Sequence, residues 1–374
     1  MRVLFPFVGD SFGGSHLSAL TLIKSLLNEN IQPIIAVHQS GIFTTYLNQN
    51  NLNWVHLDFI PFVKEPPMRN QIRSLLSASQ KIVKYLHKND IDIVHTNDSR
   101  MHLTWAFGTK IAKKKMIWHQ RNPHLSRRLD FFTLLSSEII TITEYCREQF
   151  PPLIKLRSTV VPNPIENVSL LKTKMEHKRD FINQLDVHPD SYVVGWVANW
   201  MDRKRPMIFV EMAEKLAKEM SAPICFAMFG EARYPYRELV IKKINDLGLN
   251  NCIKIMGVRT PIEPYIAGCD VLVATAVNEG FGRTLIESML QKTVVVASAH
   301  GGHLEIIKNN INGILVPADK PLAFSRAVKR LLLNPEKTKR IVESAYTDAK
   351  INYSAEMHVK NILKIYQKIL RPNG

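Results

Sequence analysis

The sequence has few cysteines and no long apolar run. Among 374 residues there are four cysteines, and none is spaced from another as metal ligands are: Cys146, Cys225, Cys252 and Cys269. Three of them lie in or beside apolar runs, where a buried free thiol is expected. Because eighteen apolar residues never occur together, no membrane span is expected. The first apolar run is too short for a signal peptide. We expect a cytoplasmic protein, at most peripheral on the inner face of the cytoplasmic membrane.

Acidic residues are scarce, since 33 Asp and Glu stand against 49 Lys and Arg. The excess is local: residues 60–128 hold fourteen basic and four acidic residues, and residues 320–374 hold twelve and four. Residues 187–319 balance at fourteen each. The two basic segments fit an anionic membrane surface, a polyanionic glycan or a lipid-linked acceptor, or they form solvated helix faces. No nucleic-acid partner is expected, because no recognised module is present and aromatic residues do not alternate with the basic ones.

Short apolar runs alternate with helical stretches along the whole chain, which predicts a doubly wound α/β fold. Seven such runs precede residue 162 and six follow residue 191, the latter including Tyr192–Val197, Ile224–Phe229 and Ile314–Val316. The prolines of Val161-Pro-Asn-Pro164 resemble the start of a linker. Together with the charged stretch 172–190 they predict a domain boundary between about residues 165 and 190. We expect two Rossmann-like domains facing each other across a cleft, over residues 1–170 and 171–354. A striped helix at 355–374 would pack back on the first domain.

Two glycine-containing loops follow predicted strands. Gly9-Asp-Ser-Phe-Gly-Gly14 precedes a helix, and the free amides of a helix N-terminus favour an anion. Its spacing is not the dinucleotide fingerprint, and an ordinary tight turn also fits it. The second loop, Asn278-Glu-Gly-Phe-Gly-Arg-Thr-Leu-Ile-Glu287, places a carboxylate in the loop and another one turn into the next helix. Such carboxylates accept hydrogen bonds from sugar and ribose hydroxyls, and the amides of 282–285 can meet a phosphate.

The second loop resembles the hallmark of the retaining glycosyltransferases of family four, the glycosyl transferases group 1 with the GT-B fold. That hallmark is two glutamates separated by seven residues, with Gly-Phe-Gly after the first. Further matches occur in the family's order: Gly13-Gly14, Asp92–Thr96, His119, Pro162–Pro164, Lys204, and Gly301-Gly302 with Glu305. The resemblance covers about residues 1–320. Asn199 stands where the family has the arginine of its diphosphate clamp, so Arg203 or Arg205 would have to supply the second charge.

The resemblance implies a set of site residues. Expected in catalysis are His119, Glu279 and Lys204, with His119 facing the transferred sugar unless it belongs to a polar network at the strand end. Glu279 would contact the donor sugar and Glu287 the ribose. Expected at the donor are Gly13, Gly14, Asn199, Lys204, Glu279, Gly280, Phe281, Gly282, Thr284, Leu285 and Glu287. No metal site and no cofactor are expected, because the histidines are scattered and the phosphate charge would meet Lys204 and helix N-termini.

The expected function is therefore retaining transfer of a sugar from a UDP- or GDP-linked donor to a glycan or a lipid-linked acceptor. Surface polysaccharide or lipopolysaccharide synthesis is the expected setting. In this family no nucleophile is consistently placed, and the donor's own β-phosphate can assist on the face that the acceptor attacks. Two alternatives stay open. One is a nucleotide-sugar 2-epimerase, which shares the fold. The other is a GT-B-like protein that binds a glycan without turnover.

Overall fold

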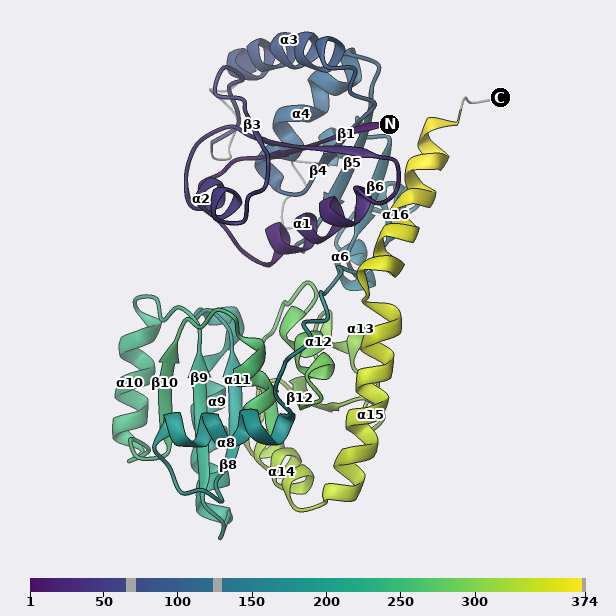
Figure 1. Cartoon of the computed structure of the whole chain (residues 1–374). Helices are drawn as coiled ribbons and strands as arrows, with labels where there is room; N and C mark the ends of the chain where they lie inside the picture. Colours follow the sequence, from purple (N-terminus) through teal and green to yellow (C-terminus); the bar gives the residue numbers. More distant parts are fainter. Residues whose placement is uncertain (65–71, 124–129, 372–374) are drawn as a thin grey trace. The chain divides into compact units, whose positions relative to one another are not determined.

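The computed structural model describes residues 1–64, 72–123 and 130–371, which divide into two compact units (Figure 1). Unit 1 comprises Met1–Pro164 and Ala355–Gly374, and unit 2 comprises Ile165–Ser354. The sequence placed the boundary at 170/171, six residues later than the structure does. The first basic segment, 60–128, falls partly outside the described residues.

Unit 1 is built on a seven-stranded parallel sheet in the order β3-β2-β1-β4-β5-β6-β7. Its strands are β1 (Arg2–Phe7), β2 (Gln32–Val37), β3 (Val55–His56), β4 (Ile93–Thr96), β5 (Lys115–Gln120), β6 (Glu138–Thr141) and β7 (Ser158–Val160). Its helices are α1 (Gly14–Leu26), α2 (Ile42–Gln49), α3 (Ile72–Lys88), α4 (Ser99–Ile111), α5 (Asp130–Thr133), α6 (Glu144–Glu148), α7 (Pro152–Lys155) and α16 (Ala355–Leu370).

Both faces of this sheet are covered, as an apolar parallel strand requires. Alternate residues of β1 point to opposite faces. Val3 and Phe5 therefore lie in one core cluster with residues of α1 and α16, whereas Leu4 lies in another with residues of α3 and α4. The amphipathic stripe of α16 explains why the last helix belongs to unit 1: Ile362 and Tyr366, one turn apart, are fully buried in the first cluster.

Unit 2 has a six-stranded parallel sheet in the order β10-β9-β8-β11-β12-β13. Its strands are β8 (Tyr192–Val197), β9 (Ile224–Phe229), β10 (Ile253–Gly257), β11 (Val271–Ala274), β12 (Val294–Ser298) and β13 (Ile314–Val316). Its helices are α8 (Lys174–Leu185), η3 (Asp202–Lys204, a 3₁₀ turn), α9 (Pro206–Glu219), α10 (Tyr236–Asp246), α11 (Glu263–Gly268), α12 (Arg283–Leu290), α13 (His303–Ile306), α14 (Pro321–Leu332) and α15 (Pro335–Asn352).

The first strand of each unit, β1 or β8, lies in the middle of its sheet. The strand order reverses beside it, between β1 and β4 in unit 1 and between β8 and β11 in unit 2. In open α/β sheets ligands bind at this reversal, outside the carboxyl ends of the strands. The predicted fold class, two Rossmann-like α/β domains with parallel sheets, is confirmed.

The charged stretch 172–190, used above as a boundary signal, contains the regular helix α8. A capping box begins this helix: the Thr173 hydroxyl accepts from the amide of Glu176, whose carboxylate accepts from the amide of Thr173. Lys174 anchors the helix to unit 2, since its Nζ donates to the carbonyl oxygens of Ala267 and Cys269 at 3.0 Å. Burial lowers the pKa of Lys174 to about 8.

Candidate functional site

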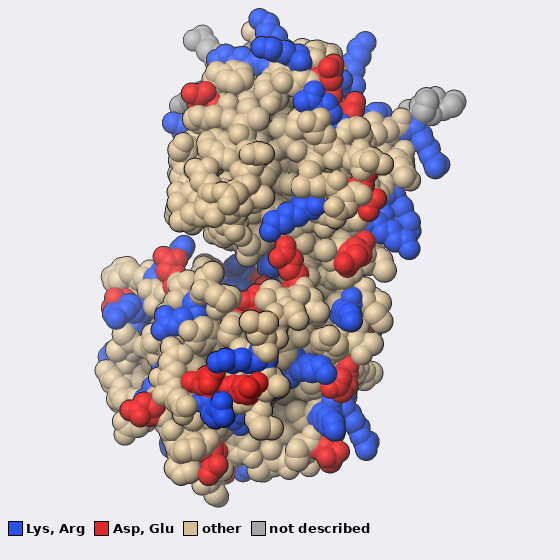
Figure 2. All heavy atoms as spheres, viewed as in Figure 1, with Lys and Arg blue, Asp and Glu red and all other residues tan. Residues whose placement is uncertain are grey.

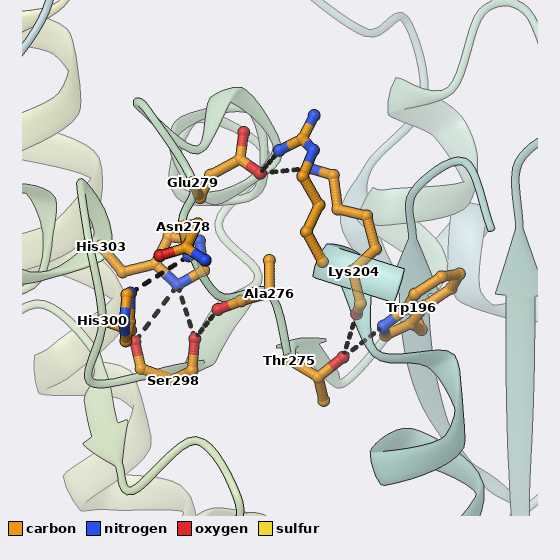
Figure 3. A network of polar contacts seen from close by, with 10 residues as sticks. Trp196, Lys204, Thr275, Ala276, Asn278, Glu279, Ser298, His300 and His303 are labelled. Atoms are coloured by element: carbon orange, nitrogen blue, oxygen red, sulfur yellow. Dashed lines mark hydrogen bonds and ion pairs between the residues drawn. The ribbon is translucent and has the colours of Figure 1, made fainter. Parts of the chain in front are cut away.

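The loops that follow β8 and β11 are joined by side-chain and backbone hydrogen bonds. The hydroxyl of Thr275 accepts from Trp196 Nε1 at 2.9 Å and donates to the carbonyl oxygen of Lys204 at 2.7 Å. The amide of Val277 donates to the carbonyl oxygen of Arg203 at 2.7 Å. Because β8 and β11 are neighbours at the reversal point, these bonds fix the η3 turn beside the loop after β11 (Figure 3).

Glu279, in the loop after β11, shares one carboxylate oxygen between two cations. Its Oε2 lies 2.6 Å from Lys204 Nζ and 2.6 Å from Arg203 Nη1 (Figure 3). The Glu279 and Lys204 side chains are only 14% and 19% exposed, whereas that of Arg203 is 43% exposed. Burial by itself raises the pKa of Glu279, but the charges of Lys204 and Arg203 outweigh it and hold the pKa below its ordinary value. Glu279 is therefore an anion paired with cations that could instead bind an anionic ligand.

The glycine pair after β12 supports the loop that carries Glu279. Gly301 has a φ of +59°, and a Cβ atom there would lie 2.6 Å from the carbonyl oxygen of Glu279. The amide of Gly302 donates to that same oxygen at 2.9 Å, and a Cβ on Gly302 would lie 2.8 Å from the carbonyl oxygen of Gly280. Only residues without a side chain allow this close approach, which fixes the path of the Glu279 loop.

A buried histidine that the sequence did not single out lies against the same loop. His303 Nδ1 is 3.1 Å from the hydroxyl of Ser298, and that hydroxyl donates to the carbonyl oxygen of Ala276. Nδ1 therefore carries the ring proton. The ring packs beside Gly282, where a Cβ would lie 3.0 Å from Cδ2. Burial lowers the pKa of His303 to about 4, so the imidazole is neutral near pH 7.

Helix α12 begins at Arg283, and its N-cap Gly282 (φ +105°) supplies no side-chain cap. Glu287 lies one turn in, and its Oε1 is 3.3 Å from Arg283 Nη2. Burial raises the pKa of Glu287, opposed by the Arg283 charge. The amide of Leu285, one of those expected to meet a phosphate, donates to the carbonyl oxygen of Gly282 at 3.0 Å. The carbonyl oxygen of Thr284 accepts from the Ser288 hydroxyl.

Phe281 stands in the Gly-Phe-Gly loop but has a packing contact. Its side chain is 4% exposed, and its ring meets that of Tyr353 edge-on at 5.8 Å between centroids. It thus anchors the loop to the end of α15 within unit 2.

Asn199, three residues before the η3 turn, and Arg205, directly after it, have hydrogen bonds elsewhere. Asn199 Oδ1 accepts from the amide of Glu231, which ties the loop after β8 to the loop after β9. Arg205 has a left-handed backbone (φ 52°), and its Nη1 donates to the carbonyl oxygen of Ala318 at 3.2 Å. Of the two arginines considered from the sequence, Arg203 is the one that joins Lys204 at Glu279.

Gly13, Gly14 and His119 lie in unit 1. Gly13 is the N-cap of α1, its carbonyl oxygen accepts from the amides of His16 and Leu17, and Gly14 begins the helix. His119 is fully buried, and its Nδ1 is 3.0 Å from His95 Nε2. Its Nε2 is also buried and has no hydrogen-bond partner among the residues that the structure describes.

The buried network around His119 extends to α16. His95 Nδ1 is 2.6 Å from the Tyr366 hydroxyl, and the His358 ring stacks on that of His119 at 6.0 Å. The structure therefore places His119 in a polar network, the second possibility that the sequence left open, and no part of its side chain is exposed.

A polar pocket of about 240 Å³ opens at the reversal point of the unit 1 sheet. It is lined by residues that follow β1, β4 and β5: Val8, Ser11, His16, Asn97, Asp98, Ser99, Arg100, His102, Gln120, Arg121 and Asn122. Arg121 is 4% exposed, and its Nε donates to Asn97 Oδ1 at 2.8 Å. Asp98 caps α4, and burial raises its pKa to about 6. Amides, hydroxyls, guanidinium groups and a carboxyl group together suit a polyhydroxylated ligand.

Between residues 1 and 371, apart from 65–71 and 124–129, three or more His, Cys, Asp or Glu side chains are nowhere grouped to hold a metal ion. Within the same ranges, every helix is too short or too polar to cross a membrane.

Comparison with known proteins places these features in a family context. Residues 177–348 match the family model of the glycosyl transferases group 1. The uncharacterized glycosyltransferase MJ1607 of Methanocaldococcus jannaschii is 21% identical over 344 residues, with 87% of each chain covered. The lipopolysaccharide core biosynthesis mannosyltransferase LpcC of Rhizobium leguminosarum is 30% identical over 126 residues, 34% of this chain and 36% of its own.

A solved structure shares the fold over nearly the whole chain. The Anabaena protein HepE, crystallised with UDP and glucose, superposes with a TM-score of 0.81 at 21% identity, covering 98% of this chain and 99% of its own. The same protein was also solved with UDP-glucose. Over residues 177–348 the chain thus carries a glycosyl transferases group 1 domain, and its fold is that of the GT-B glycosyltransferases.

Proposed function

We propose that this chain is a retaining glycosyltransferase that moves a sugar from a nucleotide-diphosphate donor to a glycan or lipid-linked acceptor. The observation that carries the proposal is the contact of Lys204 with Glu279 at 2.6 Å, inside the group 1 domain and at the reversal point of its sheet. One cation suited to a phosphate and one carboxylate suited to sugar hydroxyls are held together there, beside a helix N-terminus that has no side-chain cap.

The chemistry needs these groups in separate roles. As the bond between the sugar and the diphosphate breaks, negative charge grows on the leaving phosphate, and a fixed cation stabilises that charge. Lys204 and the amides at the start of α12 are suited to this. Glu279 would accept hydrogen bonds from the hydroxyls of the donor sugar, and Glu287 would accept them from the hydroxyls of the ribose. Retention follows in this proposal because the β-phosphate itself assists the acceptor on the face that the leaving group occupied.

The donor is proposed to be UDP- or GDP-linked, with no cofactor and no metal ion. The HepE structures with UDP and UDP-glucose support a uridine nucleotide. The charge of the diphosphate would be met by the side chains and amides described above, so that no divalent ion is needed for it.

The acceptor is proposed to be a polysaccharide or lipopolysaccharide precursor. The similarity to LpcC supports this setting, and the polar pocket of unit 1 offers groups that recognise sugar hydroxyls.

We further propose that unit 1 docks peripherally on the cytoplasmic membrane. Phe107 and Ile111 of α4 are 40% and 51% exposed, and Lys110 and Lys113 beside them are exposed as well. Lys and Arg side chains also gather over α3, where Lys81, Lys84 and Lys88 are exposed (Figures 1 and 2). Exposed apolar side chains with neighbouring cations suit the interface of an anionic bilayer.

The function is tested by product analysis with a panel of UDP- and GDP-sugars, chosen by the rise in melting temperature each one causes. Wild type is expected to transfer or slowly hydrolyse one donor, while Lys204→Ala and Glu279→Ala lose this activity. Lys242→Ala, on the exposed face of α10, serves as the control. Equal, slow release of nucleoside diphosphate by all four proteins would overturn the catalytic proposal. An epimerised nucleotide sugar formed without acceptor would establish the 2-epimerase instead.

A further inference from the structure

We propose that Arg203 is the second cation that binds the donor's diphosphate, acting together with Lys204. The inference rests on the proposed function, because it assigns one more residue to the same donor site. Arg203 and Lys204 are consecutive residues of the η3 turn, yet their cationic groups converge on one oxygen atom, Glu279 Oε2, each at 2.6 Å. Two cations that reach one atom can also reach neighbouring oxygens of one diphosphate.

The backbone of the turn explains why both side chains converge. The carbonyl oxygen of Arg203 accepts from Val277, and that of Lys204 accepts from the Thr275 hydroxyl. Both peptide units are therefore fixed to the loop that bears Glu279. The side chain of Arg203 is 43% exposed, so its guanidinium group is accessible to a ligand from solvent. A guanidinium group also offers paired donors that match phosphate oxygens.

The other basic or polar side chains nearby have different contacts. Asn199 is uncharged, and its Oδ1 accepts from the amide of Glu231. Arg205 reaches the carbonyl oxygen of Ala318. Arg283 lies against Glu287 at 3.3 Å. Arg203 is thus the arginine that the structure places with Lys204.

The shared carboxylate gives the arrangement a consequence for binding. One carboxylate neutralises one of the two cations, so the trio of Arg203, Lys204 and Glu279 keeps one net positive charge. A diphosphate carries more negative charge than a carboxylate and draws both cations toward itself. Glu279 Oε2 then loses its cationic partners and becomes an acceptor for sugar hydroxyls. Diphosphate binding by Arg203 and Lys204 therefore prepares Glu279 to bind the sugar.

The experiment measures calorimetric affinities of the full chain for UDP and UMP, and for GDP and GMP. The proteins are wild type, Arg203→Gln, Arg203→Lys, Lys204→Ala and the control Arg330→Gln, an exposed arginine of α14. Losing one charged hydrogen bond at a partly exposed group weakens binding about tenfold. Arg203→Gln is expected to weaken the diphosphate by about that factor and the monophosphate less, while Arg203→Lys retains most of the affinity. Melting temperatures confirm that each variant is folded.

The outcomes separate the inference from the proposed function. If Lys204→Ala weakens diphosphate binding but Arg203→Gln binds as Arg330→Gln does, Arg203 has no such role while the donor site stands. If Arg203→Gln loses UDP and UMP affinity equally, the side chain does not distinguish the second phosphate and the inference fails. If wild type binds neither UDP nor GDP, the proposed function falls and the role of Arg203 falls with it.

Discussion

Lys204 Nζ and Glu279 Oε2 lie 2.6 Å apart, in two loops separated by 75 residues of sequence. The lysine is turned to the carboxylate, and the same carboxylate oxygen also meets Arg203. In the proposed donor site, a donor would have to compete with this internal ion pair for Lys204. The consequence is that phosphate affinity and sugar recognition respond in opposite ways to the loss of the carboxylate.

Replacing Glu279 with glutamine is expected to separate diphosphate affinity from sugar recognition. The variant removes the anion that competes for Lys204, so affinity for the nucleoside diphosphate stays unchanged or rises. Transfer falls, with kcat/KM lower by about 10- to 100-fold, because a charged acceptor of the sugar hydroxyls is lost. Calorimetry and a transfer assay measure the two effects, with Glu343→Gln of α15 as control. A parallel loss of diphosphate affinity would contradict the assignment of Glu279 to the sugar.

Glu287 is expected to act on the nucleoside instead. Its replacement by alanine removes the proposed acceptor of the ribose hydroxyls and weakens binding of the nucleoside diphosphate by roughly 1–3 kcal/mol. Glu287→Gln keeps the shape and part of the hydrogen bonding, so its loss is expected to be smaller. Calorimetry with the preferred nucleoside diphosphate measures both. Unchanged affinity in both variants would remove Glu287 from the binding site.

The glycine pair gives a prediction with an internal control. In Gly301→Ala the new Cβ lies 2.6 Å from the carbonyl oxygen of Glu279, and the backbone keeps a φ of +59°. We expect the free energy of unfolding to fall by roughly 1–3 kcal/mol. We also expect a larger loss of transfer activity than in Gly248→Ala. Gly248→Ala has a similar φ of +67°, but no atom of the described part of the chain lies within 4 Å of its Cβ. Denaturant unfolding and the transfer assay compare them. If the two variants lose the same activity, the contact with the Glu279 loop has no functional weight.

The strands of the fold were predictable because a parallel sheet buries both faces of each strand. The apolar runs Tyr192–Val197, Ile224–Phe229 and Ile314–Val316 coincide with β8, β9 and β13 to the residue. The helix α8 was missed because its apolar residues are few and its charges resemble a linker. The pair Thr173 and Glu176, whose spacing is that of a capping box, was the available signal.

The candidate site was only partly predictable. Residues after neighbouring strands of a parallel sheet converge, which is why Lys204 and Glu279 could be expected near each other. The sequence could not predict that Arg203, rather than Arg205, contacts Glu279, because this depends on the left-handed backbone of Arg205. The contact of His303 with the loop depends on tertiary packing between the ends of β11 and β12, which carries no local sequence pattern.

Stability is expected to fall on acidification between about pH 6.5 and 4. Burial lowers the pKa of His16, His38 and His303 to about 4, whereas the unfolded histidines titrate near 6.5. The unfolded chain therefore binds more protons in this pH window. Each histidine lowers the free energy of unfolding by up to about 1.4 kcal/mol for each pH unit of acidification. Asp98, whose pKa is raised to about 6, acts in the opposite direction. Urea unfolding at pH 7.5 and 5.0 measures the net effect, and the His303→Gln variant should show a smaller difference than wild type.

Membrane docking through α4 predicts a charge-dependent interaction with lipid. Wild type is expected to bind vesicles containing phosphatidylglycerol and to dissociate as salt rises, because the attraction is screened. Each lysine near such a surface contributes about 1 kcal/mol, so reversing Lys110 and Lys113 to glutamate should weaken binding by at least about tenfold. Phe107→Ser removes the exposed ring and should weaken binding without changing its salt dependence. Lys242→Glu in unit 2 is the control, and vesicle sedimentation is the measurement. Binding that ignores salt, or equal binding by all variants, would leave these lysines as a solvated helix face.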